Sequence, residues 1–178
     1  MLREGLLEGV EDEFGIKFTQ RTIAINVRSQ ISSIQKNFDT LYERTIMETQ
    51  NLHDRCPKMV LGEVYMIAVP EYNDREFDKK AIKFKSVKPD LVEKYIKSFQ
   101  AVNKRQTVEK HFYQYESVCL LIVDFRKKQP KIYSSSSELK RNGFLPETSS
   151  VSMDGLNWDS FVPNLLKVYR ERFGKAIF

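Results

Sequence analysis

Three polar side chains alternate along one short segment and stand out as candidate site residues. The segment 23–30 reads Ile-Ala-Ile-Asn-Val-Arg-Ser-Gln, so Asn26, Arg28 and Gln30 are each two residues apart. In a β-strand such residues point to the same face. Open α/β sheets bind ligands at the carboxyl ends of their strands, so this spacing indicates a site there. A strand that emerges into solvent at that end would show the same pattern, and both interpretations are open.

Carboxylates occur on both sides of this segment. Glu11, Asp12 and Glu13 precede it, and Glu48 follows it in a helical pattern. At about 100° per residue, Glu48 lies at the margin of the buried stripe of that helix and can reach the sheet, whereas Glu43 faces solvent. A simpler role for Glu48 is an i,i+4 pair with Arg44.

Glu63 is the exception in an otherwise apolar stretch, Met59–Val69. A carboxylate in a buried strand must be paired, protonated or bound to a metal ion. We expect a structural partner for Glu63, either Arg28 or Arg44.

The periodicity predicts the elements that position these residues. A strand over 23–30, a helix over 38–53 and a strand over 59–69 form a βαβ unit, and the apolar faces of 59–69 indicate a central strand. We also expect a short strand over 15–20, helices over 89–102 and 159–173, and strands over 117–125 and 131–133. The fold class is therefore α/β, with a mixed central sheet flanked by helices.

Length and composition predict one domain, residues 1–178. The chain has 41% hydrophobic and 30% charged residues, which is typical of a soluble globular protein. Its apolar runs are too short to span a bilayer, and residues 1–5 lack the apolar core of a signal peptide, so we expect a cytoplasmic location. A glycine-rich phosphate loop is absent, and neither His53 nor His111 has a zinc-ligand partner at the usual spacing.

The net charge is +5, and lysines cluster in segments 79–88 and 126–131. This excess is compatible with a polyanionic partner, although two solvated loops would show the same clusters.

The order of elements in this sequence resembles the core of restriction-endonuclease-like nucleases. The elements are an acidic residue, a strand with alternating polar residues, a helix and an apolar strand. The resemblance covers residues 10–69, and the motif of that family is PD-(D/E)-x-K. Asp12 stands at the first acid, with Glu11 and Glu13 as rivals and no preceding proline, while Asn26 and Arg28 stand at the second acid and the lysine. Some family members take the missing acid from the following helix, where Glu48 lies.

The resemblance implies a Mg²⁺-dependent, type II-like DNA endonuclease. Asp12 and Glu48 would hold the metal ion, Arg28 would face the scissile phosphate, and Asn26 and Gln30 would complete the site. Dimers are common in the family, so a homodimer is possible. The residues expected to contact the DNA backbone are Lys36, Lys79, Lys80, Lys83, Lys85, Arg126, Lys127 and Lys128.

The departures from the motif favour an alternative. Asparagine is a poorer Mg²⁺ ligand than a carboxylate, and arginine does not readily give up its proton. The alternative is a catalytically inactive nuclease-like fold that binds nucleic acid or a protein partner. A third hypothesis is an interaction domain with no nucleic-acid role.

Overall fold

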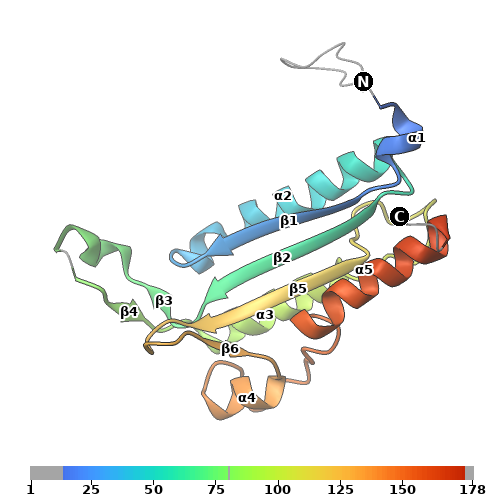
Figure 1. Cartoon of the computed structure of the whole chain (residues 1–178). Coiled ribbons are helices and arrows are strands. Elements are labelled where there is room, and N and C mark those ends of the chain that lie inside the picture. The colour runs from blue at the N-terminus through green and yellow to red at the C-terminus, as the bar shows by residue number, and fades with distance from the viewer. Residues whose placement is uncertain (1–13, 80, 175–178) are drawn as a thin grey trace.

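A four-stranded mixed sheet forms the centre of the molecule (Figure 1), in a computed structural model that describes residues 14–79 and 81–174. The strands stand in the order β1-β2-β5-β6; the first three are parallel, and β6 is antiparallel to β5. Their bounds are Ile23–Gln30 (β1), Val60–Ala68 (β2), Ser117–Asp124 (β5) and Lys131–Tyr133 (β6). The predicted α/β class with a mixed central sheet is confirmed.

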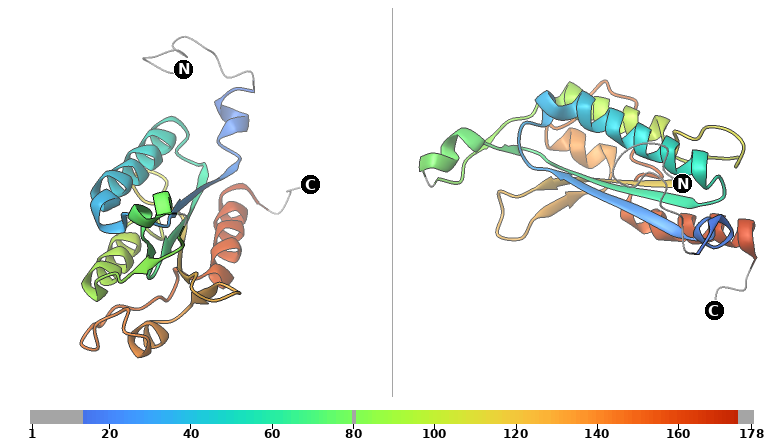
Figure 2. Two further views of the ribbon diagram at one scale, coloured as in Figure 1. Left: turned by 90° about the vertical axis from the view of Figure 1, so that its left-hand side faces the viewer. Right: turned by 90° about the horizontal axis from the view of Figure 1, so that it is seen from above.

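Helices cover the two faces of the sheet unequally. Figure 2 shows α2 (Ile34–Arg55) and α3 (Pro89–Ala101) on one face and α5 (Trp158–Phe173) on the other. Helix α5 packs against β2 and β5. Beyond Ile23, which packs against the core beneath α5, it leaves the outer face of β1 open, and Val27 there is 73% exposed.

The central position predicted for the strand 59–69 is confirmed, because β2 lies between β1 and β5. Its residues alternate between two cores. Leu61, Tyr65 and Ile67 pack toward α2 and α3, whereas Val60 and Val64 pack with Phe161 and Leu165 of α5. Gly62 allows α5 to come close, because a Cβ atom there would lie 2.8 Å from the ring of Phe161.

The strand predicted over residues 15–20 is wrong: this segment contains the short helix α1 (Ile16–Thr19). Gly15 has a positive φ of 71°, and its carbonyl accepts from the N–H groups of Phe18 and Thr19 at 3.1 Å. The alternation of Ile16 and Phe18 reflects no buried face, since both side chains are exposed. Helix α2 also begins four residues earlier than predicted.

Several short elements were not predicted from the sequence. The connection from β2 to α3 contains a two-stranded ribbon and a 3₁₀ helix, and a further helix follows β6. They are β3 (Glu71–Tyr72), η1 (Asp74–Lys79), β4 (Phe84–Lys85) and α4 (Ser136–Arg141). Within the described residues, no helix is long and apolar enough to cross a membrane.

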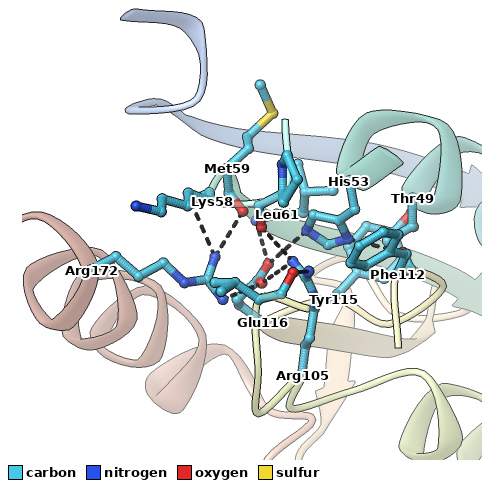
Figure 3. A network of polar contacts seen from close by, with 12 residues as sticks. Thr49, His53, Lys58, Met59, Leu61, Arg105, Phe112, Tyr115, Glu116 and Arg172 are labelled. Atoms are coloured by element: carbon cyan, nitrogen blue, oxygen red, sulfur yellow. Dashed lines mark hydrogen bonds and ion pairs between the residues drawn. The ribbon is translucent and has the colours of Figure 1, made fainter. Parts of the chain in front are cut away.

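A buried carboxylate joins four parts of the chain at the amino end of the parallel strands. Glu116 is 3% exposed, and Figure 3 shows Arg105, Arg172 and His53 directed toward it. Its Oε1 accepts from Arg172 at 2.6 Å and from Arg105 at 3.2 Å. Its Oε2 accepts from the Leu61 N–H at 2.7 Å and lies 3.5 Å from Nε2 of His53.

These partners determine the ionisation of Glu116. Burial alone would raise the pKa of this carboxyl group, but His53, Arg172 and the Leu61 N–H outweigh burial and lower the pKa below its ordinary value. The carboxylate is therefore ionised at neutral pH. It holds α2, β2, the connection after α3 and α5 together.

Replacing this charge should be costly. We expect Glu116→Gln to lower the free energy of unfolding by about 3 kcal/mol, because two arginines lose their buried counter-charge. Urea denaturation of both proteins measures the difference. Glu171→Gln, next to Arg172 in the chain, is the matched control and should change little, because Glu171 and its partner Lys167 are both exposed. Equal stabilities for Glu116→Gln and wild type would contradict a structural role for this carboxylate.

Candidate functional site

Asn26, Arg28 and Gln30 lie on one face of β1, as their alternation predicted, and this face points toward α2. Arg28 is the centre of this face: its Nη1 lies 2.6 Å from both carboxylate oxygens of Glu63, and its Nη2 donates to Glu48. The side chain of Glu63 is fully buried, that of Arg28 is 19% exposed and that of Glu48 is 50% exposed. The structure therefore confirms Arg28 as the partner of Glu63, and it confirms that Glu48 reaches the sheet while Glu43 is exposed.

Asn26 and Gln30 also have partners in the interior. Nδ2 of Asn26 donates to the hydroxyl of Tyr115 at 3.3 Å. Oε1 of Gln30 accepts from Tyr95 at 2.7 Å and from Tyr65 at 3.2 Å, while its Nε2 donates to the Ser33 carbonyl at 3.1 Å. Gln30 thus ties β1 to β2, to α3 and to the start of α2. Tyr115 could not be anticipated, because it lies 89 residues from Asn26 in the chain.

Burial changes the pKa of Glu63, which forms a charged cluster with Arg28 and Glu48. Desolvation raises the pKa of Glu63 to about 6, although the hydrogen bonds and charge of Arg28 act in the opposite direction. Desolvation would lower the pKa of Arg28, but its bonds to Glu63 and Glu48 outweigh this and raise it. At neutral pH the cluster therefore holds an arginine cation between two carboxylate groups.

The predicted site residues are only partly brought together. Asn26, Arg28 and Glu48 lie on one side of β1, whereas Asp12 falls outside the described residues. In residues 14–79 and 81–174, no group of three or more His, Cys, Asp or Glu side chains could hold a metal ion. Glu48 and Glu63 both direct their oxygens at Arg28. The described residues thus do not fit a Mg²⁺ site by themselves.

Those of the expected DNA-binding residues that the structure describes lie at the carboxyl end of the sheet. Figure 1 shows the β3–β4 ribbon and the β5–β6 turn at the end toward which the parallel strands point. Lys36 and Lys85 line an open cavity of about 840 Å³ there, together with Arg75. Sequence reasoning missed Arg75 because acids flank it, at Asp74 and Glu76, and no lysine cluster marks it.

Ion pairs distinguish the remaining basic residues. Lys79 and Lys83 both pair with Glu76, and Arg126 pairs with Asp124. Lys127 and Lys128 are exposed in the β5–β6 turn, and Lys80 lies outside the described residues. The cations of this end therefore divide into those with an internal partner and those directed to solvent.

Comparisons of this chain with protein-family models, with curated proteins and with solved structures find no significant match.

The raised pKa of Glu63 predicts a pH effect on stability. The group titrates near 4.5 in the unfolded chain and near 6 in the folded protein, so folding takes up a proton between these values. The free energy of unfolding should therefore fall as the pH rises through this window, by about 2 kcal/mol relative to Glu63→Gln. Urea denaturation of both proteins from pH 4.5 to 6.5 measures this difference. Parallel pH profiles for the two would contradict the raised pKa.

Proposed function

We propose that this chain binds DNA through a basic rim at the carboxyl end of its sheet. The basic rim consists of Lys36, Arg75, Lys85, Lys127 and Lys128. The observation that carries the proposal is the gathering of these cations, from three separate parts of the chain, at one end of the parallel strands. Cations spaced along one side of a protein are the usual means of contacting successive phosphates.

Most of the rim is available to a ligand. Among the side chains that the structure describes, Lys36, Arg75, Lys127 and Lys128 have no carboxylate partner, and all four are exposed. Only Lys85 is paired, with Glu71 at 3.1 Å. A phosphate that approaches the rim therefore does not have to displace an internal ion pair from four of its five cations.

The polar face of β1 supports phosphate binding less well. Arg28 contacts the carboxylates of both Glu48 and Glu63, so a phosphate there would compete with two anions already in place. Gln30 is 5% exposed and uses both atoms of its amide group internally. For this reason we assign DNA contact to the rim and a mainly structural role to the face of β1.

A second candidate function is Mg²⁺-dependent DNA cleavage by a restriction-endonuclease-like fold. It is supported by the β1–α2–β2 unit, in which α2 supplies Glu48 to the arginine at the lysine position of the motif. A metal site would require Glu48 to leave Arg28 and a further acid, such as Asp12, to join it. Binding without cleavage requires neither change, and it is the function we favour.

DNA binding by the rim should depend steeply on salt. Each phosphate contact contributes about −0.9 to the slope of log K against log salt. We expect Lys127→Ala with Lys128→Ala to make this slope shallower by about two, measured by fluorescence anisotropy on duplex DNA. Lys58→Ala with Lys167→Ala removes the same charge elsewhere and should leave the slope unchanged. Binding that is insensitive to salt, or equal effects of the two double variants, would contradict the proposal.

The second candidate predicts a separate result. Plasmid DNA incubated with Mg²⁺ or Mn²⁺ would be cut by the wild type and not by Glu48→Ala or Arg28→Ala. Glu43→Ala, on the exposed side of the same helix, would remain active. If the wild type binds DNA but shows no metal-dependent cutting, the chain is a binder and the cleavage hypothesis fails.

A further inference from the structure

Strand β1 has an open edge. It pairs with β2 on one side only, and within the described residues no strand lies on its other side. The Thr22 carbonyl accepts from the Val60 N–H at 3.2 Å, which shows which main-chain groups point toward β2. Because these groups alternate along a strand, the odd-numbered residues of β1, including Ile25 and Val27, direct their N–H and C=O groups to the free edge.

Apolar side chains accompany this unpaired backbone. Val27 is 73% exposed and Ile25 is 46% exposed, both on the outer face of β1. Of the twelve large hydrophobic side chains that are exposed in the described residues, six belong to β1 and the segments that flank it. They are Phe14, Ile16, Phe18, Ile25, Val27 and Ile31.

Two devices that normally protect an edge strand, a short length and a lysine or proline on the edge, are missing from β1. Native edges are usually short, or carry lysine or proline that blocks further pairing. The opposite edge, β6, has three residues and begins with Lys131. In contrast, β1 has eight residues and no proline, and its one charged side chain, Arg28, turns inward to Glu48 and Glu63. An open edge of this length and composition is suited to pair with another strand.

We propose that β1 pairs antiparallel with β1 of a second copy of this chain, so that two sheets join into one about a two-fold axis. Antiparallel pairing of identical strands is self-complementary, since each copy offers the same groups to the other. A register centred on Asn26 sets Ile25 opposite Val27 of the second copy, and the reverse. Apolar pairs of this kind stabilise a sheet.

The position of the charged residue of β1 is also compatible with the register centred on Asn26. Arg28 lies opposite Ala24 of the second copy, so the one charge of β1 never faces its own equivalent. The hydrogen-bonded pairs are then the odd-numbered residues, whose main-chain groups are free in the single chain. No change in the β1–β2 pairing is needed.

The flanking segments fit this arrangement. Helix α1 lies at the amino end of β1, where the rings of Phe14 and Phe18 are 5.2 Å apart and exposed. Ile31 follows the carboxyl end and is 51% exposed. Antiparallel pairing brings α1 of one copy next to Ile31 of the other. Because of the two-fold symmetry, this contact occurs at both ends of the paired strands. Apolar surface at both ends would thus be covered.

A second copy suits the edge better than residues 1–13 of the same chain. These residues, which lie outside the described part, include five acids and two glycines. Glycine, aspartate and glutamate are depleted in strands. The Ile-Ala-Ile-Asn-Val sequence of β1 itself is rich in β-branched residues and favours strand pairing.

Sedimentation equilibrium on the full chain tests the proposal. We expect a mass that approaches twice the 20.9 kDa of the chain as concentration rises. Val27→Lys should raise the dissociation constant at least about tenfold, because two lysines would enter an apolar edge. Val27 is exposed in the single chain, so a circular dichroism spectrum like that of wild type is expected. Ile82→Lys, at a side chain that is 79% exposed outside this edge, is the matched control and should not alter the dimer.

The register has its own test. Under mild oxidation, a mixture of the Ile25→Cys and Val27→Cys chains should form a cross-linked dimer that neither chain forms alone; Cys56 and Cys119 are buried. Cross-linking of Val27→Cys alone would overturn the register centred on Asn26. A monomer at every concentration would overturn the proposed dimer. In that case, fast hydrogen exchange of the Ile25 and Val27 amides would indicate that the edge of β1 is unoccupied. Slow exchange of these amides would indicate that another part of the same chain covers the edge. A dimer unaffected by Val27→Lys overturns the edge as its interface.

Discussion

The fold depends on one buried carboxylate at the amino end of its parallel strands. Removing an ion from water costs several kcal/mol, so Glu116 can be buried only where enough donors converge on it. Those donors come from the main chain of β2 and from Arg105 and Arg172, with His53 within ion-pair distance. Because they belong to both helical layers, the positions of α2 and α5 relative to the sheet are fixed at the same point.

The two ends of the sheet consequently serve different purposes. At the amino end, and along the inner face of β1, charges are paired internally and contribute to stability. At the carboxyl end, Lys36, Arg75, Lys127 and Lys128 have no carboxylate partner within the described residues and remain exposed. The presence of a potentially catalytic residue type is therefore a poor guide by itself to a functional site. What matters is whether the charge of the side chain is already paired within the protein. Arg28 is the clearest example, since Glu48 and Glu63 both contact it.

The periodicity of apolar residues in the sequence correctly predicted the βαβ unit. The alternation in β1, the helical spacing around Phe38 and the doubly apolar β2 were sufficient to predict the βαβ unit, and the polar position of Glu63 in β2 predicted its pairing. Helix α1 was mistaken for a strand because two alternating apolar residues suit either structure when nothing covers them. The contacts of Asn26 with Tyr115, and of Glu116 with its arginines, join residues far apart in the chain, and no local pattern records them.

The span of the Glu116 cluster has a consequence for synthesis on the ribosome. Arg172 belongs to α5, whereas Leu61 and His53 are made more than a hundred residues earlier. Until position 172 has emerged, the carboxylate lacks its shortest ion pair and the outer face of β2 lacks α5. The first two-thirds of the chain can form local helices and strand contacts during translation, but it cannot complete its packing. Until α5 has been made, a nascent chain of this protein therefore leaves the apolar side chains of β2 that pack against α5 without their cover.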